Sequence, residues 1–481
     1  MKITLSQNSK QYASIIFDVI RIFLPQLTWQ ELTGERATSA EVLDIAVKEK
    51  EIVVSLNIQN KIIQPIISTD NNELRRIIKL AVYKLFIQFL GYKGSPWGIL
   101  TGIRPTKIVH RLWDDGYNAR QIQDILEDKF LLNTEKAQKL IDVTSIQRKY
   151  FLSTEQAQRL VSIYISIPFC PTRCYYCSFP AFSLKKWGSY IPSYLDNLIN
   201  EIKMVGQALQ QKDIKVQTIY VGGGTPTSLV AHELELLLKA IYNYLYSGDT
   251  VEFTVEAGRP DTITEEKLAI LKNFLVNRIS INPQTMWEST LEKIGRKHST
   301  QDIFDKIHLA RKTGFDIINM DLIIGLPGEN LENLQYTFKK VDVVKPENLT
   351  LHTLAFKRTA KLQQNSQAVK SLTPVEEMFA FAEKWCFEKG YQPYYLYRQK
   401  QILANLENVG YSMGDKPCIY NIQMIEERQT IWGLGVGSGS KIVNPADWTL
   451  VNKYNPKDLV VYNQRINEIV QAKVDKILGL G

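Results

Sequence analysis

Residues 164–179 read YISIPFCPTRCYYCSF and place Cys170, Cys174 and Cys177 directly after a run of apolar residues. Such a run is typical of a buried β-strand, so the three thiols belong to the loop that leaves the strand. Three thiolates from one short loop can hold three irons of a 4Fe-4S cubane and leave the fourth iron without a protein ligand. The CxxxCxxC spacing therefore predicts one iron-sulfur cluster with an iron that is open to a ligand.

Two other chemistries use closely spaced cysteines, and both fit less well. Structural zinc takes four ligands in paired Cys or Cys/His arrangements, and the nearest histidine in the sequence is His232. A thioredoxin-like redox pair needs only CxxC and leaves Cys170 unexplained. Cys386 and Cys418 are interpreted as structural thiols. The odd total of five cysteines argues against a secreted disulfide framework and favours a cytoplasmic location.

From residue 161 onward, β-rich runs alternate with helical segments. Six β-then-α units in succession predict an α/β fold with a parallel sheet, either a partial barrel or an open doubly wound sheet. The helix after the sixth strand is expected to open with a capping box at Thr373, Pro374 and Glu376. The predicted strands cover residues 162–168, 218–222, 251–257, 278–283, 318–325 and 348–354.

The sequence outside the predicted barrel is expected to form further domains. Residues 44–68 alternate as short strands do, and residues 74–90 have the apolar spacing of a helix, so we expect an α+β domain over 1–93. A polar helical connector or cap is expected over 94–160, the barrel over 161–392 and a small C-terminal region over 393–481. No membrane span is expected, and the modest net charge of +8 does not indicate nucleic-acid binding.

Polar and glycine residues follow the predicted strands at their carboxyl ends. The stretch GGGTP at 222–226 ends the second strand, and consecutive glycines let the backbone approach a ligand closely. A phosphate-binding loop is disfavoured because no Gly-Lys-Ser/Thr follows. Glu256, Gln284 and Asp321 lie near the ends of the third, fourth and fifth strands, and Arg296 follows the fourth. Parallel strands end at one rim, so these residues predict a lined pocket.

The motifs resemble a known family. The CxxxCxxC loop with an aromatic residue before its last cysteine is similar to that of the radical SAM (S-adenosylmethionine) superfamily. YISIPFC, GGGTPT and NMDLIIGLPGE resemble the oxygen-independent coproporphyrinogen III oxidases and their relatives, from about residue 160 to the end of the chain. GILTGIRPTK, CSFPAF and LTLHTLAFKR are most similar to the HemZ-type coproporphyrinogen dehydrogenase branch. The resemblance implies a partial (β/α)6 TIM-like barrel.

The resemblance also implies the cofactors and their contacts. They are one 4Fe-4S cluster on Cys170, Cys174 and Cys177, and one or two molecules of SAM. His352 is also explained as a strand-end histidine with local partners. The residues that match SAM contacts of the family are Tyr164, Tyr176, Gly223, Gly224, Thr225, Glu256, Gln284, Arg296, Asp321 and His352.

The activity implied by the resemblance is the oxidative decarboxylation of two propionates of coproporphyrinogen III to vinyl groups, which gives protoporphyrinogen IX in heme biosynthesis. Its partners are the porphyrinogen substrate and a reduced flavodoxin or ferredoxin-type electron donor. The alternative is a heme-binding chaperone of the same family that does not turn over porphyrinogen. Phe179 stands where oxidases of this type have another cysteine, which favours the chaperone slightly, whereas the long N-terminal portion favours the dehydrogenase.

Overall fold

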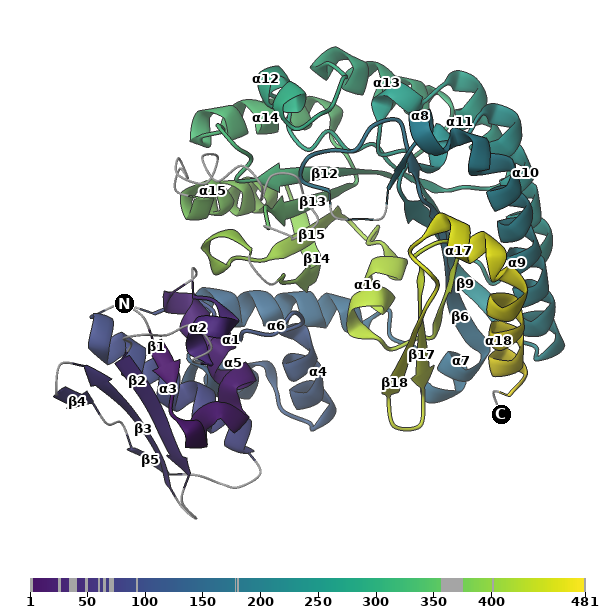
Figure 1. Cartoon of the computed structure of the whole chain (residues 1–481). Helices are drawn as coiled ribbons and strands as arrows, with labels where there is room; N and C mark the ends of the chain where they lie inside the picture. Colours follow the sequence, from purple (N-terminus) through teal and green to yellow (C-terminus); the bar gives the residue numbers. More distant parts are fainter. Residues whose placement is uncertain are drawn as a thin grey trace. The chain divides into compact units, whose positions relative to one another are not determined.

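The chain consists of two compact units, Met1–Thr144 and Ser145–Gly481, in the computed structural model (Figure 1). The division falls within helix α6 (Thr134–Arg148). The boundaries expected at residues 93, 160 and 392 stay predictions. The structure describes residues 3–24, 27–33, 41–47, 51–58, 61–63, 66–68, 73–91, 94–177, 179, 181–355, 375–399 and 402–479.

A small sheet and two packed helices form the core of the first unit. Among the described residues, the sheet has five strands in the order β1-β2-β3-β4, and β5 also pairs with β3. Buried residues of α1 and α3 are spaced three or four apart, as on one face of a helix, and include Ile16, Val19, Ile20, Val82 and Phe86. These elements confirm the strands expected over 44–68 and the helix over 74–90. Their bounds are β1 (Ile3–Leu5), η1 (Gln7–Tyr12), α1 (Ala13–Phe23), α2 (Trp29–Leu32), β2 (Glu41–Val47), β3 (Glu51–Ile58), β4 (Lys61–Ile63), β5 (Ile66–Ser68) and α3 (Leu74–Leu90).

The helical character expected within residues 94–160 is confirmed by four helices among the described residues. Asn118 and Gln121 form a capping box at the start of α5, in which each side chain accepts a hydrogen bond of 3.0 Å from the backbone N–H of the other residue. Pro105 precedes α4, where its missing N–H costs no helical hydrogen bond. The helices are α4 (Thr106–Asp114), α5 (Ala119–Phe130), α6 and α7 (Thr154–Arg159).

The second unit is built on one large sheet. Its described residues form eleven strands in the order β14-β15-β13-β12-β11-β10-β9-β6-β16-β17-β18, and the two end strands are not joined to each other. Strands β6 and β9 to β13 run parallel, which confirms the predicted fold as a partial barrel. They coincide with the six predicted strands: β6 (Leu160–Ile167), β9 (Lys215–Gly223), β10 (Glu252–Glu256), β11 (Arg278–Ser280), β12 (Ile318–Ile324) and β13 (Asn348–Thr353).

Helices follow these strands and lie in an arc along one face of the sheet (Figure 1). The capping box predicted at Thr373 and Pro374 lies outside the described residues. None of the helices in the described ranges combines the length and the hydrophobicity of a membrane span. The helices are α8 (Leu184–Trp187), α9 (Ile191–Gln211), α10 (Ala231–Tyr244), α11 (Glu265–Asn273), α12 (Glu288–Lys293), α13 (Thr300–Lys312), α14 (Leu331–Val344) and α15 (Val375–Glu388).

Strand β10 illustrates how the sequence divides the two faces of this sheet. Phe253 and Val255 are fully buried, and the Phe253 ring lies 6.5 Å from that of Tyr246, just after α10. Glu252 and Glu256 alternate with them and therefore point to the opposite face. The helices thus cover the apolar face, and the concave face carries polar side chains.

The C-terminal segments extend the same sheet and close the amino-terminal end of the barrel. Glu252 accepts hydrogen bonds from the first backbone N–H groups of α16, at Ile419 (2.8 Å) and Tyr420 (3.0 Å). Arg278 donates to the carbonyls of Lys416 (3.1 Å) and Pro417 (2.9 Å) just before this helix. Glu252 and Arg278, at the amino-terminal ends of β10 and β11, therefore fix α16 at this end of the barrel as a plug. The segments are β14 (Tyr391–Tyr397), η8 (Leu403–Asn405), β15 (Asn408–Met413), α16 (Ile419–Glu426), β16 (Ile431–Leu434), β17 (Gly439–Asn444), β18 (Thr449–Tyr454), α17 (Leu459–Gln464) and α18 (Ile466–Leu478).

Candidate active site

The cysteine loop leaves the carboxyl end of β6 and is tied to the glycine loop that leaves β9. The backbone N–H groups of Gly224 and Thr225 donate to the carbonyls of Ile167 and Phe169, each at 2.8 Å. A Cβ atom on Gly224 would lie 2.5 Å from the Phe169 oxygen, a distance that no real side chain adopts. Glycine is therefore required here because two backbones touch.

The thiols of this loop have polar neighbours. The Cys170 sulfur lies 3.4 Å from the Thr225 hydroxyl, and Arg259 donates to the Cys174 sulfur at 3.8 Å. The pKa of the Cys170 thiol is raised to about 11, chiefly by burial; the hydrogen bond with Thr225 opposes this rise, and the neighbouring Cys177 and Cys174 support it. Iron binding must therefore displace a proton from this thiol.

No three His, Cys, Asp or Glu side chains in the described ranges are arranged to hold a single metal ion. A cubane places each cysteine on a different iron, so its thiolates lie farther apart than ligands of one ion do.

Glu256 lies at the carboxyl end of β10 on the concave face. The Tyr220 hydroxyl donates to its carboxylate at 2.6 Å. Burial raises the pKa of Glu256 to about 7, and the nearby Asp321 acts in the same direction. A Cβ atom on Gly222 would lie 2.9 Å from the Glu256 carboxyl carbon, so the first glycine of the motif leaves room for this carboxylate.

Gln284 follows β11 in a strained conformation. Its φ is +70°, in the left-handed region that residues other than glycine rarely adopt. Its backbone N–H donates to the Asp321 carbonyl, and its carbonyl accepts from the Ile323 N–H, each at 2.9 Å. The buried side-chain oxygen of Gln284 has no hydrogen-bond partner among the described residues. Strain together with an unpaired polar atom is typical of a ligand-binding position.

Arg296 joins two strand ends to the cysteine loop. Its guanidinium donates to the carbonyls of Gly258 (3.1 Å) and Asn282, and to the Tyr176 hydroxyl at 3.0 Å. Its buried Nε has no partner within the described part of the chain. One cation therefore lies between the cysteine loop and the polar ends of β10 and β11.

Asp321 and His352 lie on adjacent strands, β12 and β13. The His352 Nε2 is 3.8 Å from the Asp321 carboxylate, and its Nδ1 is 3.3 Å from the Tyr397 hydroxyl. Burial favours a higher pKa for Asp321, but His352 and hydrogen bonds from Asn319 and Thr350 lower it below its usual value. His352 thus has the local partners of the strand-end interpretation and also lies beside a predicted SAM contact, so its role as a contact stays a prediction.

Tyr164 lies on β6 within a stack of three tyrosines. Its ring is 6.2 Å from that of Tyr220 and 6.2 Å from that of Tyr420, while Tyr220 and Tyr420 stack at 4.5 Å. The buried Tyr420 hydroxyl has no hydrogen-bond partner among the described residues. The stack lies beside Glu256, because Tyr220 belongs to both groups.

Sequence reasoning missed several residues of this site. Tyr220 lies two positions before Gly222 on β9, so the alternation of a strand is the signal that could have found it. Arg259 follows the end of β10 closely and belongs to the class of strand-end residues. Tyr420 lies on α16, far away in the sequence, and carries no local signal. The thiols taken as structural, Cys386 and Cys418, are buried, and Cys418 lies 3.2 Å from a Glu252 oxygen.

Comparison with known proteins gives the class of this protein first. Residues 164–341 match the model of the radical SAM superfamily, and the chain is a radical SAM protein. Its cofactors are accordingly a 4Fe-4S cluster and S-adenosylmethionine. The fold resembles that of coproporphyrinogen III oxidase (HemN) from Escherichia coli, with a TM-score of 0.54 and 23% identity over 68% of this chain and 73% of that chain.

The sequence relatives define the family within this class. The chain is 44% identical over 381 residues to the oxygen-independent coproporphyrinogen-III oxidase-like protein HemZ of Bacillus subtilis (strain 168). This alignment covers 79% of this chain and 76% of that protein. It is also 40% identical over 196 residues to heme chaperone HemW of the same organism, and this alignment covers 40% of this chain and 50% of that protein. The chain therefore belongs to the family of oxygen-independent coproporphyrinogen-III oxidase-like proteins.

The side chains of the site fit these cofactors. SAM carries an amino group, a carboxylate and ribose hydroxyls, which need hydrogen-bond acceptors and donors. The unpaired oxygen of Gln284 and the unpaired Nε of Arg296 supply one of each among the described residues. The glycine loop has no room for side chains at Gly222 or Gly224 and presents its backbone instead.

Proposed function

We propose that this protein catalyses the oxygen-independent oxidative decarboxylation of two propionates of coproporphyrinogen III to vinyl groups, which gives protoporphyrinogen IX. Each propionate loses one hydrogen atom, carbon dioxide and one electron, and the electron passes to an acceptor. When bound and reduced, the cluster and SAM together supply a 5′-deoxyadenosyl radical that abstracts the hydrogen atom. The observation that carries the proposal is the convergence of Glu256, Gln284, Arg296 and Asp321 beside the cysteine loop, in a chain 44% identical to a HemZ protein.

In this proposal Cys170, Cys174 and Cys177 hold three irons as thiolates. Arg296 supports the assignment because its contact with the Tyr176 hydroxyl orients the loop toward the ends of β10 and β11. The proposed SAM contacts are Tyr164, Tyr176, Gly223, Gly224, Thr225, Glu256, Gln284, Arg296, Asp321 and His352.

The chain itself excludes water from one end of the barrel. The plug formed by α16 is held at Glu252 and Arg278, and the tyrosine stack lies above it, next to Glu256. A reaction that passes through a carbon radical benefits from such a closed chamber, because dioxygen adds to carbon radicals and a closed site prevents side reactions. We propose a cytoplasmic location, with a reduced flavodoxin or ferredoxin-type protein as electron donor.

A heme chaperone is the second candidate. It is favoured by the 40% identity to heme chaperone HemW over 196 residues, and Phe179 is 59% exposed beside the cysteine loop, where oxidases of this type have another cysteine. A chaperone of this kind would keep the cluster and bind heme without converting porphyrinogen.

One experiment separates the two functions. Anaerobically reconstituted protein is incubated with dithionite, SAM and coproporphyrinogen III, and the porphyrins are analysed by mass spectrometry after oxidation. Loss of two carbon dioxide units together with four hydrogens, the change expected for two vinyl groups, supports the proposal, and Cys174→Ser should abolish it. Stable heme uptake by the same preparation, with no decarboxylated product, would contradict the enzymatic function and support the chaperone.

A further inference from the structure

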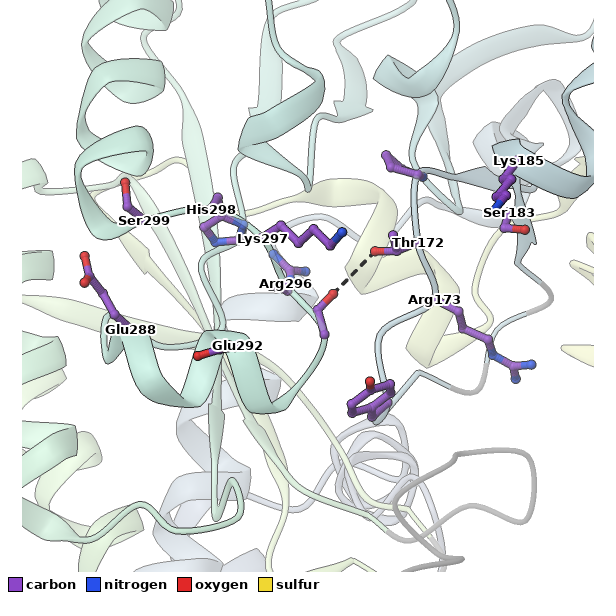
Figure 2. A pocket seen from close by; sticks show the side chains of 13 residues that line it. Thr172, Arg173, Ser183, Lys185, Glu288, Glu292, Arg296, Lys297, His298 and Ser299 are labelled. Carbon is purple, nitrogen blue, oxygen red and sulfur yellow. Dashed lines mark hydrogen bonds between the residues drawn. The ribbon is translucent and has the colours of Figure 1, made fainter.

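The cavity beside the cysteine loop (Figure 2) belongs to the site already described, because Arg296 lines it. A second cavity, of about 340 Å³, lies wholly within the first unit, and none of the residues assigned to the cluster or to SAM lines it. Pockets for small organic ligands start at about 300 Å³, so this cavity is large enough to hold one. Its lining comes from α1, α3, α4, the end of α5 and the segment GILTGIRPTK (98–107), for which the proposed reaction has no use.

Part of the lining of this second cavity is apolar and firmly placed. Ile99 and Leu100 of GILTGIRPTK are buried, and Ile108 and Phe130 add two further apolar side chains. The Ile99 N–H donates to the Phe130 carbonyl at 2.9 Å, which ties the segment to the end of α5. Gly98 makes this approach possible, because its φ is +50° and a Cβ atom on it would collide with the Phe130 oxygen. The segment thus forms a fixed apolar wall.

Positive charge lines another part of the cavity. Arg75 and Lys79 are four residues apart on α3 and therefore lie on the same face of this helix. The Lys79 ammonium donates to the Thr101 hydroxyl of GILTGIRPTK at 2.7 Å, so positive charge lies next to the apolar wall. Asp18 of α1 is the one acidic residue among the described residues that line the cavity. The cations together outweigh this carboxylate, and the cavity favours an anion.

A third cation, Arg76, is already neutralised and shapes the cavity. Its Nε donates to the Glu73 carboxylate at 3.1 Å, and its guanidinium also donates to the Lys129 carbonyl at 3.1 Å. The guanidinium carbon lies 6.0 Å from the centre of the Phe130 ring, a cation–π contact. Arg76 thus joins α3 to the end of α5, and the charge available to a ligand comes from the other two cations.

We propose that this cavity binds a small amphipathic anion, whose carboxylate or phosphate group lies at Arg75 and Lys79 and whose apolar body lies against the wall formed by GILTGIRPTK. Guanidinium and ammonium groups are the usual partners of both anionic groups. A neutral apolar ligand would leave the cations without a counter-charge, and an inorganic anion would leave the apolar wall uncovered. No residue of the proposed reaction takes part, so this binding is independent of the proposed function.

The test is titration calorimetry of the full-length protein with octanoate, octyl phosphate, 1-octanol and inorganic phosphate. Octanoate and octyl phosphate combine an anion with an alkyl chain, and the other two ligands each supply only one of these parts. The charge variant is Arg75→Gln with Lys79→Gln. Its control, Arg111→Gln with Arg120→Gln, removes two exposed cations of α4 and α5 that do not line the cavity. A third variant, Ser14→Trp, adds bulk at an exposed lining residue and leaves the charge unchanged.

At least one of the two amphipathic anions should bind saturably, about tenfold or more tightly than 1-octanol and inorganic phosphate. Tighter binding of octanoate would identify the ligands as carboxylates, and tighter binding of octyl phosphate would identify them as phosphate esters. The charge variant and Ser14→Trp should each keep the wild-type circular dichroism spectrum and weaken this binding about tenfold or more, whereas the control should keep the wild-type affinity.

Three results would overturn the proposal. They are the absence of saturable binding of either anion, equally tight binding of 1-octanol, and wild-type affinity in Ser14→Trp. A loss of affinity in the control as large as that in the charge variant would also overturn it, because the effect would then come from the overall charge of the unit. If the charge variant does not fold, Ser14→Trp decides the outcome, since it changes no charge and lies at an exposed position.

Discussion

A buried carboxylate on the first long helix of the barrel, where this helix packs against the C-terminal segments, offers a quantitative test of what holds the fold together. Glu201 of α9 is fully buried. It accepts hydrogen bonds from the Lys473 ammonium of α18, the Tyr462 hydroxyl (2.7 Å), the Gly435 N–H (2.8 Å) and the Asn455 side chain (3.1 Å). Gly435 belongs to the glycine-rich loop after β16, beside β6. This carboxylate therefore joins the last helix of the chain to the rim of the barrel.

Glu201→Ala should be strongly destabilising. It leaves the Lys473 ammonium, whose side chain is 9% exposed, without its counter-charge. Removing one partner of a buried ion pair costs about 3–5 kcal/mol. Lys473 still keeps the Asn455 side-chain oxygen at 2.9 Å, so we expect a loss near the lower limit, about 3 kcal/mol. Urea unfolding followed by circular dichroism measures this loss as a lower midpoint at constant slope.

A double-mutant cycle with Lys473→Met identifies the cause. Glu201→Ala with Lys473→Met removes both charges and should cost less than the sum of the two single changes. Glu201→Gln keeps hydrogen-bond acceptors for the neutral donors and serves as the matched control for the charge. The reasoning is refuted if Glu201→Ala costs less than about 1 kcal/mol, or if the two single losses simply add.

Three further predictions concern the candidate site. Gly224→Ala should keep the circular dichroism spectrum but lower the iron content after reconstitution, because the new methyl group collides with the Phe169 carbonyl; full iron content would contradict this. Since burial raises the pKa of Glu256 from 4.5 to about 7, the folded state binds more protons, and this group's contribution to stability falls as the pH rises from about 4.5 to about 7. In Glu256→Gln the urea midpoint should no longer show this decrease in stability across the same pH range. A pH profile identical to that of the wild type would contradict the prediction. Gln284→Gly should be about 1 kcal/mol more stable than Gln284→Ala, because glycine adopts the φ of +70° without the steric strain that a Cβ atom causes; equal urea midpoints would argue against backbone strain.

Much of the barrel and part of the site could be predicted from local sequence. The six parallel strands were identified because each apolar run is short and is followed by a helical segment. Glu256, Gln284, Arg296 and Asp321 were found because parallel strands end at one rim, and the structure brings these four residues close to one another. Local pattern, however, carries no information about Tyr420, which lies two hundred positions after Tyr220 and stacks on it from α16.

Local sequence is enough to predict the helices, the strands and the cysteine loop, since strand alternation, helix spacing and the CxxxCxxC motif are properties of neighbouring residues. Three features emerge only from the folded chain: β16 pairs with β6, Glu252 caps α16, and neither ring nitrogen of the buried His298 has a hydrogen-bond partner among the described residues. Such contacts join segments that are far apart in the chain. Their positions depend on the register and packing of all the intervening elements, which no local propensity encodes.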